Sequence, residues 1–118
     1  MKYKQYQKMK DSSVEWIGEI PEHWEARKLK FMTKKINSGI TPRGGSTIYE
    51  DEGIPLLRSQ NIHFDGLHLD NVAYINKEIH DEMTNSKIIE NDVLLNITGA
   101  SIGRCTIIPN KFGEGNVN

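Results

Sequence analysis

Side chains that can read the edges of DNA base pairs occur in three polar segments of this sequence. Arginine can bind guanine through two hydrogen bonds, asparagine and glutamine can bind adenine, and hydroxyl or backbone N–H groups can hold phosphate. The candidates for such contacts are Thr41, Arg43, Gly44, Ser46 and Thr47; Arg58, Ser59, Gln60 and Asn61; and Ser101 and Arg104. Each segment can also be an ordinary polar loop, and residue types alone favour that interpretation for any one of them.

A nucleophilic serine is suggested by GASIG at residues 99–103, which matches the G-x-S-x-G pattern of hydrolase nucleophile elbows. Such an elbow leads from a strand into a helix, whereas residues 104–108 have the composition of a strand. All four histidines precede Ser101, although the hydrolase order places the catalytic histidine after the serine. We therefore expect a glycine-framed hairpin turn and no hydrolase site.

Metal, redox and phosphate-binding chemistry are also disfavoured. The spacing of His63, His68, His80 and Cys105 matches no zinc motif, so we expect solvated or hydrogen-bonding histidines. One cysteine cannot form an internal disulfide, which suits a reducing compartment. The glycine-rich segment lacks the Gly-Lys-Ser/Thr ending of a phosphate-binding loop, and residues 50–52 are expected to be a solvated acidic turn, with a divalent cation as the alternative. We expect no cofactor and no metal ion.

Size and charge narrow the class of protein further. A chain of 118 residues, 36% of them hydrophobic, fits one small folded domain and excludes a multidomain enzyme. No apolar run is long enough for a membrane span or a secretory signal, so we expect a cytoplasmic protein. Residues 1–35 hold nine Lys/Arg against five Asp/Glu, and residues 36–118 hold six against eleven. This charge balance is a poor match for a protein that binds DNA by bulk electrostatics alone, so with DNA as partner, local geometry or another subunit must supply much of the attraction.

The elements that must position the polar segments are short. We predict strands at 54–59, with Pro55 near its start or at an edge, and at 72–75. Residues 61–71 are expected to form a loop or hairpin turn. Asn76 is placed to cap a helix over 77–85. Strands at 92–98 and 104–108 are predicted to form an antiparallel pair joined by residues 99–103.

The beginning of the chain has a different pattern. Residues 1–12 are expected to be a mobile tail, and residues 14–24 an irregular segment whose tryptophans, Trp16 and Trp24, can lie across a core. Residues 25–36 fit helical and strand spacing equally, which leaves the element type open. The fold class is therefore α+β, with a mixed, partly antiparallel sheet and a few short helices.

Several segments together resemble the DNA-specificity (S) subunits of type I restriction-modification systems. The resemblance rests on VEWIGEIPEHW, INSGITP, GIPLLR, SKIIENDVLL and TGASIGR, at residues 14–24, 36–42, 53–58, 86–95 and 98–104. These segments follow the family order. Residues 13–118 are thus similar to the N-terminal part of a target recognition domain, and the resemblance implies an incomplete domain of that fold.

The resemblance implies a function without catalysis. In this family two target recognition domains, separated by helices, each read one half of a split DNA site. Methyl transfer belongs to modification subunits, and DNA cleavage belongs to the restriction subunit. We therefore expect double-stranded DNA and these subunits as partners, with the Arg43 loop and the segment from Arg58 to Asn61 as DNA contacts.

Two other interpretations remain open. Trp16 and Trp24 can form a surface that docks a partner subunit, because tryptophan is enriched at interface hot spots, or they can simply belong to the core. A part of a domain can also expose apolar surface and cover it by forming a homodimer.

Overall fold

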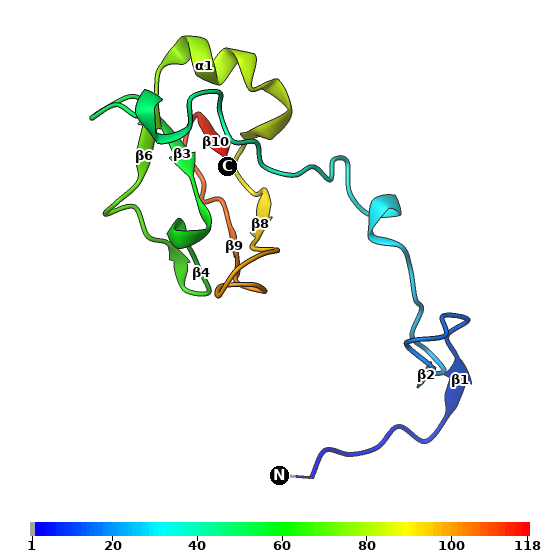
Figure 1. The fold of residues 1–118 in the computed structure, drawn as a ribbon. Helices are drawn as coiled ribbons and strands as arrows, with labels where there is room; N and C mark the ends of the chain where they lie inside the picture. The colour runs from blue at the N-terminus through cyan, green and yellow to red at the C-terminus, as the bar shows by residue number, and fades with distance from the viewer. Residues whose placement is uncertain (1) are drawn as a thin grey trace. The chain divides into compact units, whose positions relative to one another are not determined.

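The computed structural model describes residues 2–118 and divides the chain into two compact units. The N-terminal unit is Met1–Ile36, and the C-terminal unit is Asn37–Asn118. Figure 1 follows the chain through both units. The predicted tail over 1–12 and domain over 13–118 stay predictions, although part of that tail, Met9–Asp11, forms a strand.

The N-terminal unit is built around one hairpin. Strand β1 (Met9–Asp11) pairs antiparallel with β2 (Glu19–Pro21), and a single 3-10 turn, Leu29–Phe31, follows. This turn is the only regular structure in residues 25–36, the segment for which the sequence left both a helix and a strand open. Within residues 2–36 only Pro21 is fully buried. The unit therefore has almost no core of its own.

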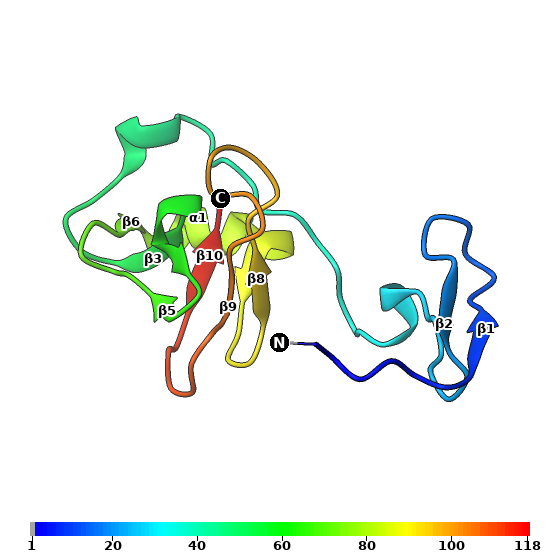
Figure 2. The ribbon, with the colours of Figure 1, turned by 90° about the horizontal axis from the view of Figure 1, so that it is seen from below.

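The C-terminal unit is organised by a four-stranded sheet with the order β6-β3-β10-β7. The central strands β3 and β10 run parallel, while β6 and β7 are antiparallel to their neighbours. Two hairpins, β4–β5 and β8–β9, complete the strands (Figure 2). The strands are β3 (Ile54–Leu57), β4 (Ile62–His63), β5 (Gly66–Leu67), β6 (Ala73–Ile75), β7 (Lys87–Ile88), β8 (Val93–Leu95), β9 (Cys105–Ile107) and β10 (Gly115–Val117).

Helix α1 (Lys77–Glu82) begins where the sequence predicts. The Asn76 side chain accepts a hydrogen bond from the Ile79 backbone N–H at 2.9 Å, which satisfies one N–H group that the helix leaves unpaired. The helix is shorter than the predicted 77–85, because a 3-10 turn, Thr84–Ser86, replaces its last turn. A further 3-10 turn spans Gly45–Ile48, and another spans Ser59–Asn61.

The core lies on both faces of the sheet. Leu56 and Leu57 are adjacent in β3 and fully buried, and adjacent strand residues point to opposite faces. Leu56 packs in a cluster with Met83 beyond α1, whereas Leu57 packs with Ile88 and Ile108 beside β8 and β9. The sheet is therefore covered by the helix on one face and by a hairpin on the other.

These observations confirm the α+β class, the strand near 54–59 with Pro55 at its second residue, the hairpin at 61–71 and the antiparallel pair β8–β9. The β8–β9 pair is shorter than predicted, and its outer face is exposed at Val93, Leu95 and Ile107. Within residues 2–118, no helix combines the length and the apolar character that a bilayer span requires.

Candidate nucleic-acid interface

The carboxyl ends of β3 and β10 bring distant segments together. The Asn118 N–H donates to the Leu57 carbonyl at 2.9 Å, and the Ile40 N–H donates to the Val117 carbonyl at 2.9 Å. The Thr41 hydroxyl then donates to the Asn118 side-chain oxygen at 2.7 Å. The start of the loop that contains Thr41 is thereby fixed beside the end of β3.

A glycine makes this close approach possible. A Cβ atom on Gly39 would lie 2.4 Å from the backbone carbonyl carbon of Asn118, closer than real Cβ atoms come. The INSGITP segment therefore needs glycine at this position because two backbones meet there. The glycine was visible in the sequence, but its neighbour 79 residues away was not.

Asn96 joins the second and third predicted segments. Its side-chain Nδ2 donates to the Ser59 carbonyl at 2.9 Å and to the Ser101 hydroxyl oxygen at 3.0 Å. Its backbone N–H donates to the Arg104 carbonyl at 2.8 Å. Asn96 is buried, and sequence reasoning missed it because an asparagine within an apolar run gives no signal of its long-range partners.

Two of the predicted contact residues are built into the fold. The Arg58 guanidinium donates to the Asn71 carbonyl at 2.7 Å and lies over the Tyr49 ring, 5.4 Å from its centroid. Asn61 is 1% exposed, accepts from the Arg58 N–H and donates to the His68 carbonyl, both at 2.9 Å. These hydrogen bonds fix the exposed Ser59 and Gln60 between them.

The glycine-rich loop places Arg43 at the surface. Gly44 and Gly45 both have positive φ, a conformation that glycine adopts without strain. The Thr47 hydroxyl donates to the Gly44 carbonyl at 2.7 Å and closes the turn. Ser46 is exposed beside it, and the structure records no hydrogen bond or ion pair of the Arg43 guanidinium with the described residues.

Ser101 lies in a hairpin turn, as the sequence predicts. The chain continues from this turn into strand β9 and not into a helix, and the Ser101 hydroxyl is bonded to Asn96. This geometry does not fit a nucleophile elbow.

Three side chains that can ligate metal ions gather at the β4–β5 hairpin. They are His63, Asp65 and His68, and their ligand atoms all lie within 4.8 Å of one another. The hydrogen bond from His68 lowers the pKa of the Asp65 carboxyl below its usual range. Spacing alone did not single out Asp65, because only the hairpin turn brings it between the two histidines.

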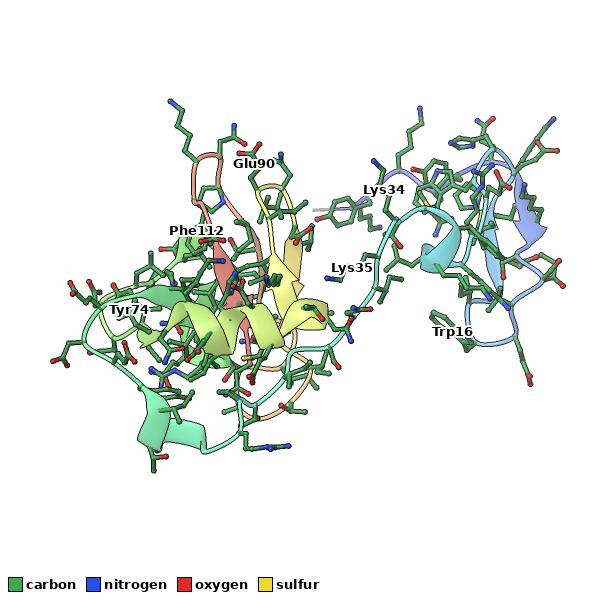
Figure 3. All side chains as sticks on the ribbon, turned by 90° about the horizontal axis from the view of Figure 1, so that it is seen from above. Trp16, Lys34, Lys35, Tyr74, Glu90 and Phe112 are labelled. Carbon is green, nitrogen blue, oxygen red and sulfur yellow. The ribbon has the colours of Figure 1, made fainter. Side chains whose placement is uncertain are left out.

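Both tryptophans lie in the N-terminal unit, outside any core of the described residues. Trp16 is 86% exposed (Figure 3). Trp24 is 49% exposed, and its ring centroid lies 5.6 Å from that of Tyr6. The N-terminal unit offers these rings no core of its own to lie across, because it buries only Pro21 among residues 2–36.

The fold and these loops define an α+β module whose candidate contacts stand on loops, of which residues 58–61 and 101–104 are joined through Asn96. No protein-family model matches the chain. Among curated proteins it is similar to the "Putative type I restriction enzyme MjaX specificity subunit" of Methanocaldococcus jannaschii, with 27% identity over 97 residues. The match covers 80% of this chain and 22% of that protein, so the chain spans about a fifth of the relative's length. This similarity confirms the resemblance to type I specificity subunits that the sequence motifs indicated.

Proposed function

We propose that this chain is part of a type I restriction-modification specificity subunit and recognises DNA sequence in the cytoplasm. It reads one half of a split site and directs partner subunits that methylate or cleave DNA, without catalysing either reaction. Three loops form the recognition surface, which we call the three-loop surface: residues 41–47, which begin beside the end of β10, residues 58–61, which follow β3, and residues 101–104 of the β8–β9 turn.

The observation that best supports this function is the way Asn96 and Asn118 join the three loops. Asn96 bonds to Ser59 and Ser101. Asn118 bonds to Thr41 through its side chain and to the carbonyl of Leu57, the residue before Arg58, through its N–H. Base readout needs several donors and acceptors at fixed positions relative to one another, because each base pair presents its groups at fixed positions in the major groove. Loops fixed to one another meet that requirement better than loops that move independently.

The side chains divide naturally between two tasks. The exposed Arg43 guanidinium and the exposed Gln60 amide have the donors that guanine and adenine edges accept. Ser46, Thr47 and the glycine backbone can hold phosphate, and Arg104 can do either. Arg58 and Asn61 act by fixing the loop, because the Arg58 Nη2 and both polar atoms of the Asn61 amide bond to backbone groups of the chain.

The experiment is selection from a randomised DNA duplex pool, with the chain alone and with a modification subunit. Salt near ~0.15 M screens non-specific attraction. Enrichment of one short motif is the expected result. Retention without enrichment, or no retention in either condition, contradicts sequence recognition by this chain.

Two arginine variants make the test specific for the three-loop surface. Arg43→Ala should cost about 1–3 kcal/mol of binding at one base position if Arg43 reads a guanine. The matched control is Arg27→Ala, because Arg27 is an exposed arginine of the N-terminal unit that pairs with Glu25 at 3.0 Å. Equal losses for the two variants on every sequence would contradict the assignment of readout to the loops.

A second candidate function, docking of a partner subunit through the tryptophan segment, is favoured by the exposure of Trp16. An exposed tryptophan is a typical anchor of a protein interface. Adding a modification subunit should then shift tryptophan fluorescence and protect it from quenching. If the complex forms but tryptophan fluorescence does not change, docking at this segment is contradicted.

A further inference from the structure

The β4–β5 hairpin holds two imidazole rings and a carboxylate within six residues of the chain. His63 ends β4, Asp65 lies in the turn, and His68 follows β5. The two imidazole rings stack with centroids 3.7 Å apart and planes inclined by 13°. Two histidines and one carboxylate form a ligand set that suits zinc and similar divalent transition metals.

The hydrogen bond of His63 leaves one ring nitrogen free for a metal. Its Nε2 lies 3.0 Å from the Gln60 carbonyl oxygen. A carbonyl oxygen only accepts, so Nε2 carries the proton and Nδ1 keeps its lone pair in the neutral ring. Histidine ligands of metals commonly donate their other N–H to a backbone carbonyl in this way, which fixes the tautomer and the ring orientation.

The contact between His68 and Asp65 has the spacing of neighbouring metal ligands. His68 Nε2 lies 2.9 Å from Asp65 Oδ1. Ligand atoms at about 2.0–2.2 Å from one zinc ion are roughly 3–3.5 Å apart. A metal ion can therefore replace the proton between His68 and Asp65. The stacked His63 ring must turn out of its parallel orientation to direct Nδ1 at the same ion, because a metal lies in the plane of each imidazole ligand.

The buried Asn61 fixes the backbone at His68, one of the three ligands. The buried Asn61 accepts from the His68 N–H through its carbonyl and donates to the His68 carbonyl through its side chain, both at 2.9 Å. Asn61 and His68 also line a hollow of about 220 Å³ with Asp70 and Asn71. The hollow has room for the water molecules that would complete the coordination of a metal with three protein ligands.

We propose that His63, Asp65 and His68 form a binding site for a divalent transition-metal ion, with Zn²⁺ as the best match. The ion fixes the β4–β5 hairpin against the loop that contains Gln60. The site needs only residues of one hairpin, so it does not depend on DNA recognition by this chain.

The test is a calorimetric titration of the untagged full chain with ZnCl₂, together with NMR of the imidazole nitrogens. We expect one Zn²⁺ per chain and shifts of the His63 and His68 ring signals. His63→Ala and Asp65→Asn should each weaken binding by at least about tenfold. Asp65→Asn keeps the side-chain shape at an exposed turn, and circular dichroism verifies that the variant is folded.

His23→Ala is the matched control, because His23 is an exposed histidine of the N-terminal unit. It should leave zinc affinity unchanged. The absence of heat and of ring shifts with Zn²⁺ would overturn the proposal, and so would equal affinity in folded Asp65→Asn and the unsubstituted chain.

Discussion

The two units have similar supplies of apolar side chains but use them differently. Every buried hydrophobic side chain assigned to the core lies in the C-terminal unit, whereas Trp16, Leu29, Phe31 and Ile36 of the N-terminal unit are exposed. The difference follows from pairing: a sheet of four strands has two faces to cover, while a single hairpin is marginal by itself. Long-range strand pairing, and not apolar content, decides which unit is stable and which has apolar surface left for a partner.

The largest expected change in the free energy of unfolding distinguishes the two units directly. Leu56→Ala removes a fully buried side chain from the sheet and should lower the free energy of unfolding by ~2–5 kcal/mol. Leu29→Ala, at a side chain that is 63% exposed, should change it by less than about 0.5 kcal/mol. Urea unfolding followed by circular dichroism measures both. Similar losses for the two leucines would contradict the contrast between the units.

The second-largest change in stability is expected from a buried polar network around Asn116. Asn116 is fully buried, bonds to Ser86, and places Nδ2 3.1 Å from His80 Nδ1 and 3.3 Å from the Met83 carbonyl. Asn116→Ala removes these bonds from buried groups, of which only Ser86 and the Met83 carbonyl keep a bond to each other, and should cost about 1–3 kcal/mol. Asn37→Ala is the control, because Asn37 is an exposed asparagine with one bond to the Asn85 carbonyl. An equally small change for both would show that the network contributes no stability.

His80 should make the C-terminal unit sensitive to acid. Burial lowers the pKa of His80, and the nearby Lys87 and Lys77 lower it further, against the opposite effects of Glu114 and Asp81. The unfolded chain then binds a proton more readily, so this contribution is complete above the ordinary histidine pKa of about 6.5 and is lost as the pH falls through the lowered pKa. Unfolding measured between about pH 7 and 5 should show this loss, and H80N should flatten it. A profile that H80N leaves unchanged would exclude His80 as the cause.

The N-terminal cap of α1 is expected to contribute less to stability. Asn76→Ala removes the bond to the Ile79 N–H and should cost ~1 kcal/mol, whereas Asn76→Asp keeps an acceptor and should cost less. Thermal unfolding of the two variants measures the difference. Equal costs would mean that packing, and not the cap, determines where the helix starts.

The smallest effect on stability belongs to the N-terminal unit. Trp16→Ala should change the free energy of unfolding by less than about 0.5 kcal/mol, because the side chain is 86% exposed. Acrylamide should quench the native tryptophans nearly as well as the denatured ones. Strong protection of Trp16 in the isolated chain would remove the distinction between a packed and an unpacked unit.

Local signals in the sequence predicted much of the C-terminal unit. Asn76 marks the start of a helix because its side chain acts on the next residues, and the GASIG turn joins strands that are neighbours in the chain. The parallel pairing of β3 with β10 was not predicted, because a pairing across about sixty residues depends on the whole sheet. The same reason explains why Asn96 was missed as the link between two loops.

The candidate site was predicted by residue type and only partly by role. Arg43 is exposed, as a base contact must be, but the Arg58 Nη2 and both polar atoms of the Asn61 amide bond to backbone groups. Arginine and asparagine serve both tasks equally well, so their types cannot distinguish readout from loop fixation. The contacts of each side chain decide its role, and these contacts are made with Tyr49, Asn71 and His68, which come from other segments.

The most direct test of the account is an NMR titration of the full chain with the duplex obtained by selection. Backbone amide shifts should change together in residues 41–47, 58–61 and 101–104, because one surface made of three joined loops meets the DNA. The amides of residues 2–36 should change little. Changes confined to the N-terminal unit, or to one of the three loops, would contradict the proposal that the three-loop surface reads DNA.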